Sequence, residues 1–270
     1  MTPLWPDFAT HWAHMGHAVC AGLNVASVPE AEAAAAQFGL PITARPLFPA
    51  GEYCAMLAEH PADVGLAFLR AAAQSQDGRV LVQSHLPGAL LVVGAMCGDA
   101  GWAVRPAVRV ELLPKYALTP IAFSCPAEEV PGIEQALAPM LHAPHVAMCE
   151  FVLADGEPVL VFARAARTLD APLALTADLA EQKGAACLRY LTPATGHVER
   201  IEGLETARAL PGVTAVVCRA APGIALRHAT SIAARDAAGY ILAHAPTTGE
   251  AEQRAQAAAE HIHIITTAMS

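Results

Sequence analysis

The stretch CEFVLADGEPVLVFARAAR, residues 149–167, contains two apolar runs on either side of the segment ADGEP. Runs of apolar β-branched and aromatic residues that flank an Asp-Gly turn predict a β-hairpin. The first run carries one carboxylate, Glu150, which alternation places on the face opposite Cys149 and Phe151. The second run carries none. As a site for a hard cation such as Mg²⁺, this hairpin would therefore lack half of the oxygen ligands that two acidic strands supply.

The composition of the 270-residue chain predicts a compact α+β or α/β protein. Hydrophobic residues make up 54% of the sequence and charged residues 15%, which argues against disorder. The net charge of −9, with 16 Lys and Arg residues, argues against a nucleic-acid partner. The 7 cysteines have no CxxC spacing, so we expect reduced thiols and neither disulfides nor a zinc site.

The beginning of the chain, MTPLWPDFATHW, has no basic segment followed by an apolar core, so no secretory signal is expected. The longest apolar run, residues 88–97, is too short to cross a bilayer as a helix. We therefore expect a cytoplasmic protein without a membrane partner.

Local patterns outside the hairpin predict helices and strands that alternate at first, and consecutive strands after residue 88. Asp7 is placed to cap the first helix, and Ser27 or Pro29 to open the second. Helices are expected at 7–21, 27–39, 60–75, 126–143, 179–191, 204–212 and 247–264, and strands at 40–48, 78–86, 88–98, 102–113, 196–203, 213–220 and 239–245. This order favours an α+β fold of antiparallel sheets covered by helices.

Histidines gather in two places without a recognisable metal motif. His11, His14 and His17 are spaced three residues apart. In a helix of 3.6 residues per turn, side chains at this spacing do not stay on one face, so we interpret the three histidines as part of an ordinary helix surface and not as a metal site. His142 and His145 precede the hairpin and are better placed for catalysis, although isolated histidines are more often structural. No metal site is assigned from these residues.

Five stretches carry a resemblance to a known family when they are taken in order. They are AAAQFGLPITARP (34–46), RVLVQSHLPGALLVV (79–93), the hairpin, and residues 195–217 and 235–262 near the C-terminus. Together they resemble the ATP-grasp family, most closely its carboxylate–amine ligases of the L-amino-acid ligase type. The resemblance implies an N-terminal helix in residues 1–25, a first α+β lobe at 26–87, a second at 88–270, and a cleft between the lobes. It also implies that the N-terminal domain of that family is missing here.

In that family ATP lies between the lobes, lysines hold its phosphates, and hairpin carboxylates hold Mg²⁺. An acyl-phosphate forms on the substrate and is then attacked by an amine. The resemblance places Arg45 at the position of a phosphate-binding lysine, and Gln83, with His85 nearby, on the adenine side. Glu150 takes the position of the first metal carboxylate.

The sequence departs from the family pattern in the second strand of the hairpin. The second carboxylate falls on Phe162 and the following asparagine on Arg164. A shift of one residue places the family arginine on Arg167, but then Ala163 replaces the carboxylate. Two unit charges about 4 Å apart interact by about 4 kcal/mol at an effective dielectric constant near 20, so Arg164 would oppose a nearby Mg²⁺.

Three hypotheses follow. The favoured one is a degenerate ATP-grasp protein, similar to a pseudoenzyme, that acts as a binding or partner subunit. It would bind a small carboxylate or amino-acid-like ligand and form a homodimer or join a partner protein, and ATP and Mg²⁺ would bind only if the altered site still accepted them. The second is an active amide or peptide ligase that uses Glu150, Arg45 and Arg167. The third is an ATP-independent enzyme whose acid, base and anion-binding groups are Glu150, His145, Arg164, Arg167 and Lys115.

Overall fold

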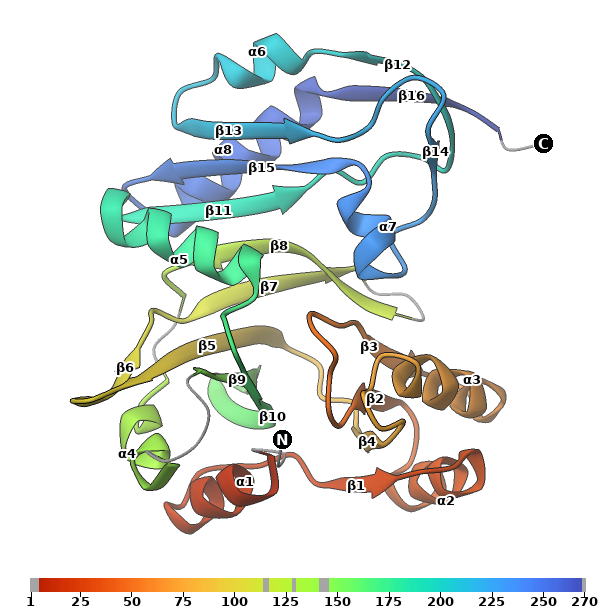
Figure 1. Ribbon diagram of the computed structural model, residues 1–270, viewed down its shortest axis with the longest axis vertical. Coiled ribbons are helices and arrows are strands. Elements are labelled where there is room, and N and C mark those ends of the chain that lie inside the picture. The colour runs from red at the N-terminus through yellow and green to blue at the C-terminus, as the bar shows by residue number, and fades with distance from the viewer. Residues whose placement is uncertain (1–4, 114–116, 128–129, 141–145, 269–270) are drawn as a thin grey trace. The chain divides into compact units, whose positions relative to one another are not determined.

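The computed structural model describes residues 5–113, 117–127, 130–140 and 146–268. The chain divides into two compact units (Figure 1). The first contains residues 1–107, 114–118 and 128–170, and the second contains residues 108–113, 119–127 and 171–270. The lobe boundaries expected from the sequence stay a prediction.

The first unit contains a small antiparallel sheet covered by two helices. Its strands follow in the order β1 (Gly22–Val25), β4 (Val80–Ser84), β2 (Ile42–Pro46) and β3 (Ala55–Ala58). The beginning of β8 (Ala117–Cys125) pairs with the other edge of β3. Helices α2 (Val28–Phe38) and α3 (Pro61–Ala72) pack against this sheet and against each other. The sheet places β2 in the interior, so that all of its residues are buried.

Helix α2 begins where the sequence predicts it. The hydroxyl of Ser27 accepts a hydrogen bond from the backbone N–H of Glu30, and the Glu30 carboxylate accepts one from the N–H of Ala26. This arrangement resembles a capping box, except that the Glu30 carboxylate binds the N–H of Ala26, the residue before the Ser27 cap. Gly39 ends the helix with a φ of 78°, a conformation that favours glycine.

Another set of strands in the first unit contains the predicted hairpin. Strands β9 (Val146–Ala154) and β10 (Glu157–Ala166) form it, and β5 (Ala89–Gly98) and β6 (Gly101–Val104) follow on the β9 side. Asp155 and Gly156 make the turn with φ angles of 53° and 86°. Positive φ at both turn positions matches the type of hairpin that Asp-Gly favours, so this prediction is confirmed.

The N-terminal segment covers the outer edge of β10. Leu160 accepts a backbone hydrogen bond from Cys20 at 2.8 Å and donates one to Ala18 at 3.0 Å. Helix α1 (Trp5–His14) packs against β10 and buries its aromatic side chains. Helix α4 (Ile133–Leu137) and a short 3₁₀ turn, η1 (Ala138–Met140), complete the unit.

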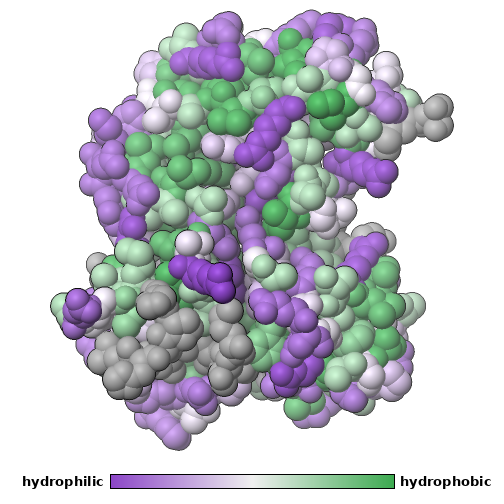
Figure 2. Space-filling view, in the orientation of Figure 1, coloured by the Kyte–Doolittle hydropathy of each residue, from purple (hydrophilic) through white to green (hydrophobic). Residues whose placement is uncertain are grey.

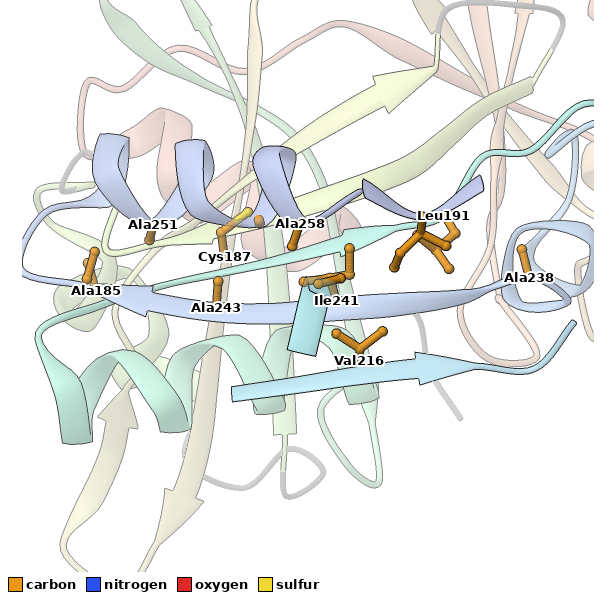
Figure 3. Packing of buried hydrophobic residues seen from close by; sticks show 13 residues of the cluster. Ala185, Cys187, Leu191, Val216, Ala238, Ile241, Ala243, Ala251 and Ala258 are labelled. Carbon is orange, nitrogen blue, oxygen red and sulfur yellow. The ribbon is translucent and has the colours of Figure 1, made fainter. Parts of the chain in front are cut away.

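The second unit is built on an antiparallel sheet with the order β7 (Val108–Leu113), β8, β11 (Ala185–Tyr190), β15 (Gly239–Ala245) and β13 (Val213–Cys218). A smaller sheet contains β14 (Ala225–Leu226), β12 (Gly196–Glu202) and β16 (His263–Thr267). The helices are α5 (Ala171–Lys183), α6 (Leu204–Arg208), α7 (Ile232–Asp236) and α8 (Thr248–His261). Small residues of α8, including Ala251 and Ala258, pack with Ile241 and Ala243 of β15 in a buried core (Figure 3).

The prediction of a helix over residues 179–191 is wrong in its second half. Helix α5 ends at Lys183, Gly184 adopts a φ of 97°, and β11 begins at Ala185. Strand β11 lies between β8 and β15, and most of its residues are buried. Pairing along both edges and burial therefore outweigh the helix propensity of its Ala and Leu residues.

Other expected boundaries also differ. The first helix ends at His14, and Asp7 lies in its first turn, not at its cap. Within the described residues, the helix expected at 126–143 covers only Ile133–Leu137 and the following 3₁₀ turn, and the strand expected at 102–113 is divided into β6 and β7. The last helix ends at His261, and β16 follows it.

The predicted fold class, α+β with antiparallel sheets covered by helices, is confirmed. Among the helices in the described part of the chain, none combines the length and the apolar character needed to cross a membrane.

Candidate functional site

Glu150 lies in the middle of β9, between β5 and β10. Its Cα partners are Val92 in β5 and Phe162 in β10. A register shift between Leu160 and Phe162 marks a bulge at Val161, which brings Phe162 opposite Glu150. Directly paired residues share a face of the sheet, so the side chains of Val92, Glu150 and Phe162 project to the same side.

The carboxylate of Glu150 is bonded to Arg45 and Tyr53, and we call these three residues the Glu150 cluster. Arg45 Nη1 donates to Glu150 Oε2 at 2.6 Å, and Tyr53 Oη donates to Glu150 Oε1 at 2.6 Å. Arg45 Nη1 also lies 3.4 Å from Tyr53 Oη. The exposed fractions of Arg45, Tyr53 and Glu150 are 7%, 8% and 8%. Both carboxylate oxygens are therefore engaged by protein donors in a buried environment.

Phe162 fills the position opposite Glu150 with an aromatic ring. The residue is fully buried, and its ring stacks on Trp5 with the centroids 5.9 Å apart. The Tyr53 ring meets it edge to face, also at 5.9 Å. Because Phe162 packs between an α1 residue and the Glu150 cluster, it contributes to the apolar surroundings of this carboxylate.

Arg164 is buried and has its own partly buried partner. It forms an ion pair with Asp170, which follows β10 in the chain. The guanidinium carbon of Arg164 lies 5.8 Å from the centroid of the Tyr53 ring. Gly94 in β5 makes room for the returning chain, because a Cβ there would lie 2.6 Å from Leu169. The segment that follows the hairpin thus packs back on β5 and supplies the carboxylate that neutralises Arg164.

The residues expected on the adenine side lie at the end of β4. Gln83 is 1% exposed, and its Nε2 donates to the carbonyl oxygen of Cys20 at 3.3 Å. His85 Nδ1 lies 3.1 Å from Thr43 Oγ1. Burial and then the charge of Arg45 lower the pKa of His85, so its imidazole is neutral at neutral pH. Both side chains already have protein partners.

Of the remaining predicted site residues, the structure describes Arg167, which does not join the Glu150 cluster. Arg167 is exposed in the bend after β10. Lys115, His142 and His145 lie outside the described residues. Among the residues that the structure describes, no three His, Cys, Asp or Glu side chains gather closely enough to hold a metal ion. Of the predicted groups, the structure brings Arg45 and Glu150 into contact, with Arg164 beside the same tyrosine ring.

Burial and neighbouring charges shift the pKa values of Arg45, Arg164 and Tyr53. Burial lowers the pKa of Arg45, but Tyr53 and Glu150 outweigh this effect, and the pKa is raised overall. Burial also lowers the pKa of Arg164, and Asp170 leads the groups that raise it above its ordinary value. The pKa of Tyr53 lies well above its ordinary value because burial and then the Glu150 charge disfavour the phenolate. Tyr53 therefore stays a hydrogen-bond donor.

A comparison of the wild type with Tyr53→Phe tests this hydroxyl. The pKa of Tyr53 in the folded state is raised above the unfolded value of about 10. The stabilisation that the protonated hydroxyl contributes is therefore complete below pH 10 and is lost as the pH rises toward the folded-state pKa. Above pH 10 the wild-type free energy of unfolding should fall more steeply than that of Tyr53→Phe, by up to about 1.4 kcal/mol per pH unit. Urea unfolding from pH 8 to 11 measures the difference, and parallel curves would contradict it.

Tyr53 and Asp170 were not predicted as members of the site from the sequence. Tyr53 comes before β3 in the segment AGEYCAM, and Asp170 ends the segment TLD after the hairpin. Polar residues are common in the loops next to apolar strands, so the positions of these two residues did not distinguish them from other loop residues. A signal was present in the charge balance, because a buried Arg164 requires a carboxylate nearby.

Comparisons with known proteins place this architecture among described families. Residues 189–267 match the family model of the L-amino acid ligase C-terminal domain 2. No curated relative matches the chain in sequence. An L-amino acid ligase from Bacillus licheniformis matches in structure with a TM-score of 0.71 and 13% identity, over 96% of this chain and 71% of that chain.

Two further solved structures have the same fold. A carboxyaminoimidazole ribonucleotide synthase from Aspergillus clavatus, complexed with ATP, matches with a TM-score of 0.59 and 15% identity over 94% of this chain and 71% of that chain. A biotin carboxylase from Campylobacter jejuni matches with a TM-score of 0.59 and 12% identity, over 97% of this chain and 67% of that chain. These likenesses confirm the predicted fold, while the roles of individual residues stay predictions.

Proposed function

We propose that this chain, which has the ATP-grasp fold of carboxylate–amine ligases, does not transfer phosphoryl groups from Mg·ATP at the β9–β10 hairpin. The premise also includes a C-terminal segment of the L-amino acid ligase type. The role of the chain is then that of a binding or partner subunit. The observation that carries this proposal is the engagement of both Glu150 oxygens by Arg45 and Tyr53.

The described hairpin residues do not fit a magnesium ion. Mg²⁺ requires oxygen ligands in nearly octahedral geometry. Glu150 would have to release Arg45 and Tyr53 to become such a ligand, and its partner across the hairpin is Phe162. Leaving Arg45 buried without its carboxylate would cost several kcal/mol.

The charge balance supports the same proposal. Arg45 is paired with Glu150, and Arg164 with Asp170, so these four side chains carry no net charge. A two-metal site depends on an excess of negative charge that attracts the cations, and these ion pairs supply none. No step of phosphoryl transfer is therefore assigned to this hairpin.

A thermal-shift titration with Mg·ATP tests the proposal. A ligand present at 100 times its Kd stabilises a protein by about 2.7 kcal/mol, which shifts the melting temperature by several degrees. We expect no shift for the wild type and no ADP release with amino acids present. The proposal fails if Mg·ATP stabilises the wild type, and if the wild type releases ADP while Glu150→Gln does not. This pattern would indicate an active ligase. Turnover without nucleotide that requires Arg164 would instead favour an ATP-independent enzyme.

The proposed role as a partner subunit is supported by an apolar surface on α3. Leu66 and Leu69 are 45% and 57% exposed, and Figure 2 shows hydrophobic residues over α3 at the lower right. Exposed apolar patches are typical of protein interfaces. We expect a homodimer at micromolar concentration by light scattering, and a monomer for the double variant Leu66→Gln and Leu69→Gln. A monomeric wild type would contradict self-association.

A further inference from the structure

The second unit contains a cavity of about 450 Å³ that is separate from the Glu150 cluster. Its walls are the end of β11 with the following residues, the last turn of α8, and the beginning of β16. This volume lies within the range of about 300–1,000 Å³ that is typical of sites for small organic ligands.

Apolar residues of the core line one part of the cavity. Leu191 and Ile262 are 5% and 9% exposed and belong to the buried core of the second unit, where Leu191 is labelled in Figure 3. Ala259 and Ile264, which are partly buried, pack against the same core and also line the cavity. An apolar side chain that entered this part of the cavity would therefore contact these residues and would be partly removed from water.

The rim carries groups of opposite charge. Arg189 is half-buried and is held by Glu111, whose Oε2 accepts from its Nη2 at 2.5 Å. Glu260 is exposed, and its Oε1 accepts from Gln256 Nε2 at 2.8 Å. These contacts restrain both charged side chains, while Arg189 retains a second terminal nitrogen and Glu260 a second oxygen. A ligand complementary to this rim has one carboxylate and one ammonium group.

We propose that this cavity binds a short zwitterionic peptide of two or three residues with an apolar side chain. The carboxylate lies at Arg189, the ammonium group lies at Glu260, and the apolar side chain rests on Leu191 and Ile262. A single amino acid would leave much of the cavity unfilled. The site does not depend on the proposed loss of phosphoryl transfer, because none of these residues belongs to the Glu150 cluster.

Calorimetric titration of the full-length protein with the dipeptide Leu-Leu tests this proposal. We expect Arg189→Gln and Glu260→Gln each to weaken binding about tenfold or more, because each loses a charge-assisted hydrogen bond. Arg189→Lys should retain part of the affinity. N-acetyl-Leu-Leu should bind the wild type and Glu260→Gln equally, and Leu-Leu amide should bind the wild type and Arg189→Gln equally.

A filling variant and a control complete the experiment. Ala259→Leu places a larger side chain in the cavity and should abolish binding, whereas Arg208→Gln, at a residue outside the cavity, should bind like the wild type. The proposal is overturned if Leu-Leu does not bind at millimolar concentration, or if the cavity variants bind it unchanged. It is also overturned if the acetylated peptide binds as tightly as Leu-Leu, since the ligand would then be a simple carboxylate. None of these outcomes depends on Mg·ATP, so the two proposals fail separately.

Discussion

Glu150→Ala is expected to lower the free energy of unfolding by about 3–5 kcal/mol, because it leaves Arg45 buried without its carboxylate. Arg45 is 7% exposed, its Nη1 is 2.6 Å from Glu150, and its Nε is buried without a hydrogen-bond partner among the described residues. The variant also removes the acceptor of the Tyr53 hydroxyl. Urea unfolding at pH 7 measures the loss.

Two comparisons separate the buried charge from a general effect of the substitution. Glu205→Gln breaks an exposed pair with Arg208 on α6, and it should change the stability by less than about 1 kcal/mol. Replacing the whole Glu150 cluster by Arg45→Met, Tyr53→Phe and Glu150→Leu should cost less than Glu150→Ala alone, since no unpaired charge remains. If Glu150→Ala costs no more than Glu205→Gln, the cluster is not a buried ion pair in solution.

The position of Glu150 could be predicted from the sequence because it depends on local rules. The Asp155–Gly156 turn fixes the hairpin, and strand alternation then fixes the face on which Glu150 lies. The partners of Glu150 could not be predicted in this way. Tyr53 is 97 positions away in the sequence and Arg45 is 105, so only the pairing of distant strands brings them together.

The same reasoning explains the error at residues 185–190. Their composition favours a helix, but β11 is placed by pairing with β8 and β15, which are distant in the sequence. Arg164 is a related case. The sequence placed it correctly on the hairpin but could not show that the chain returns after β10 and brings Asp170 to it.

Phe162→Ala is expected to lower the free energy of unfolding by about 3–5 kcal/mol, since truncation of a buried aromatic residue leaves a cavity. Phe162 is fully buried and touches the rings of Trp5 and Tyr53. Phe162→Leu should cost less because it keeps most of the apolar volume. Urea unfolding checks both values, and a loss below about 1 kcal/mol for Phe162→Ala would contradict the packing described here.

Phe162→Glu restores a carboxylate opposite Glu150 and tests whether a missing ligand alone prevents Mg²⁺ from binding. We expect the variant to be destabilised, because a charge then replaces a buried ring. Millimolar MgCl₂ should not raise its melting temperature relative to EDTA, since Arg45 and Tyr53 still hold the oxygens of Glu150. Phe151→Glu, on the opposite face of β9, is the matched control for a buried glutamate. A magnesium-dependent rise in Phe162→Glu alone would mean that Mg²⁺ can displace Arg45, and that one side chain separates this hairpin from a metal site.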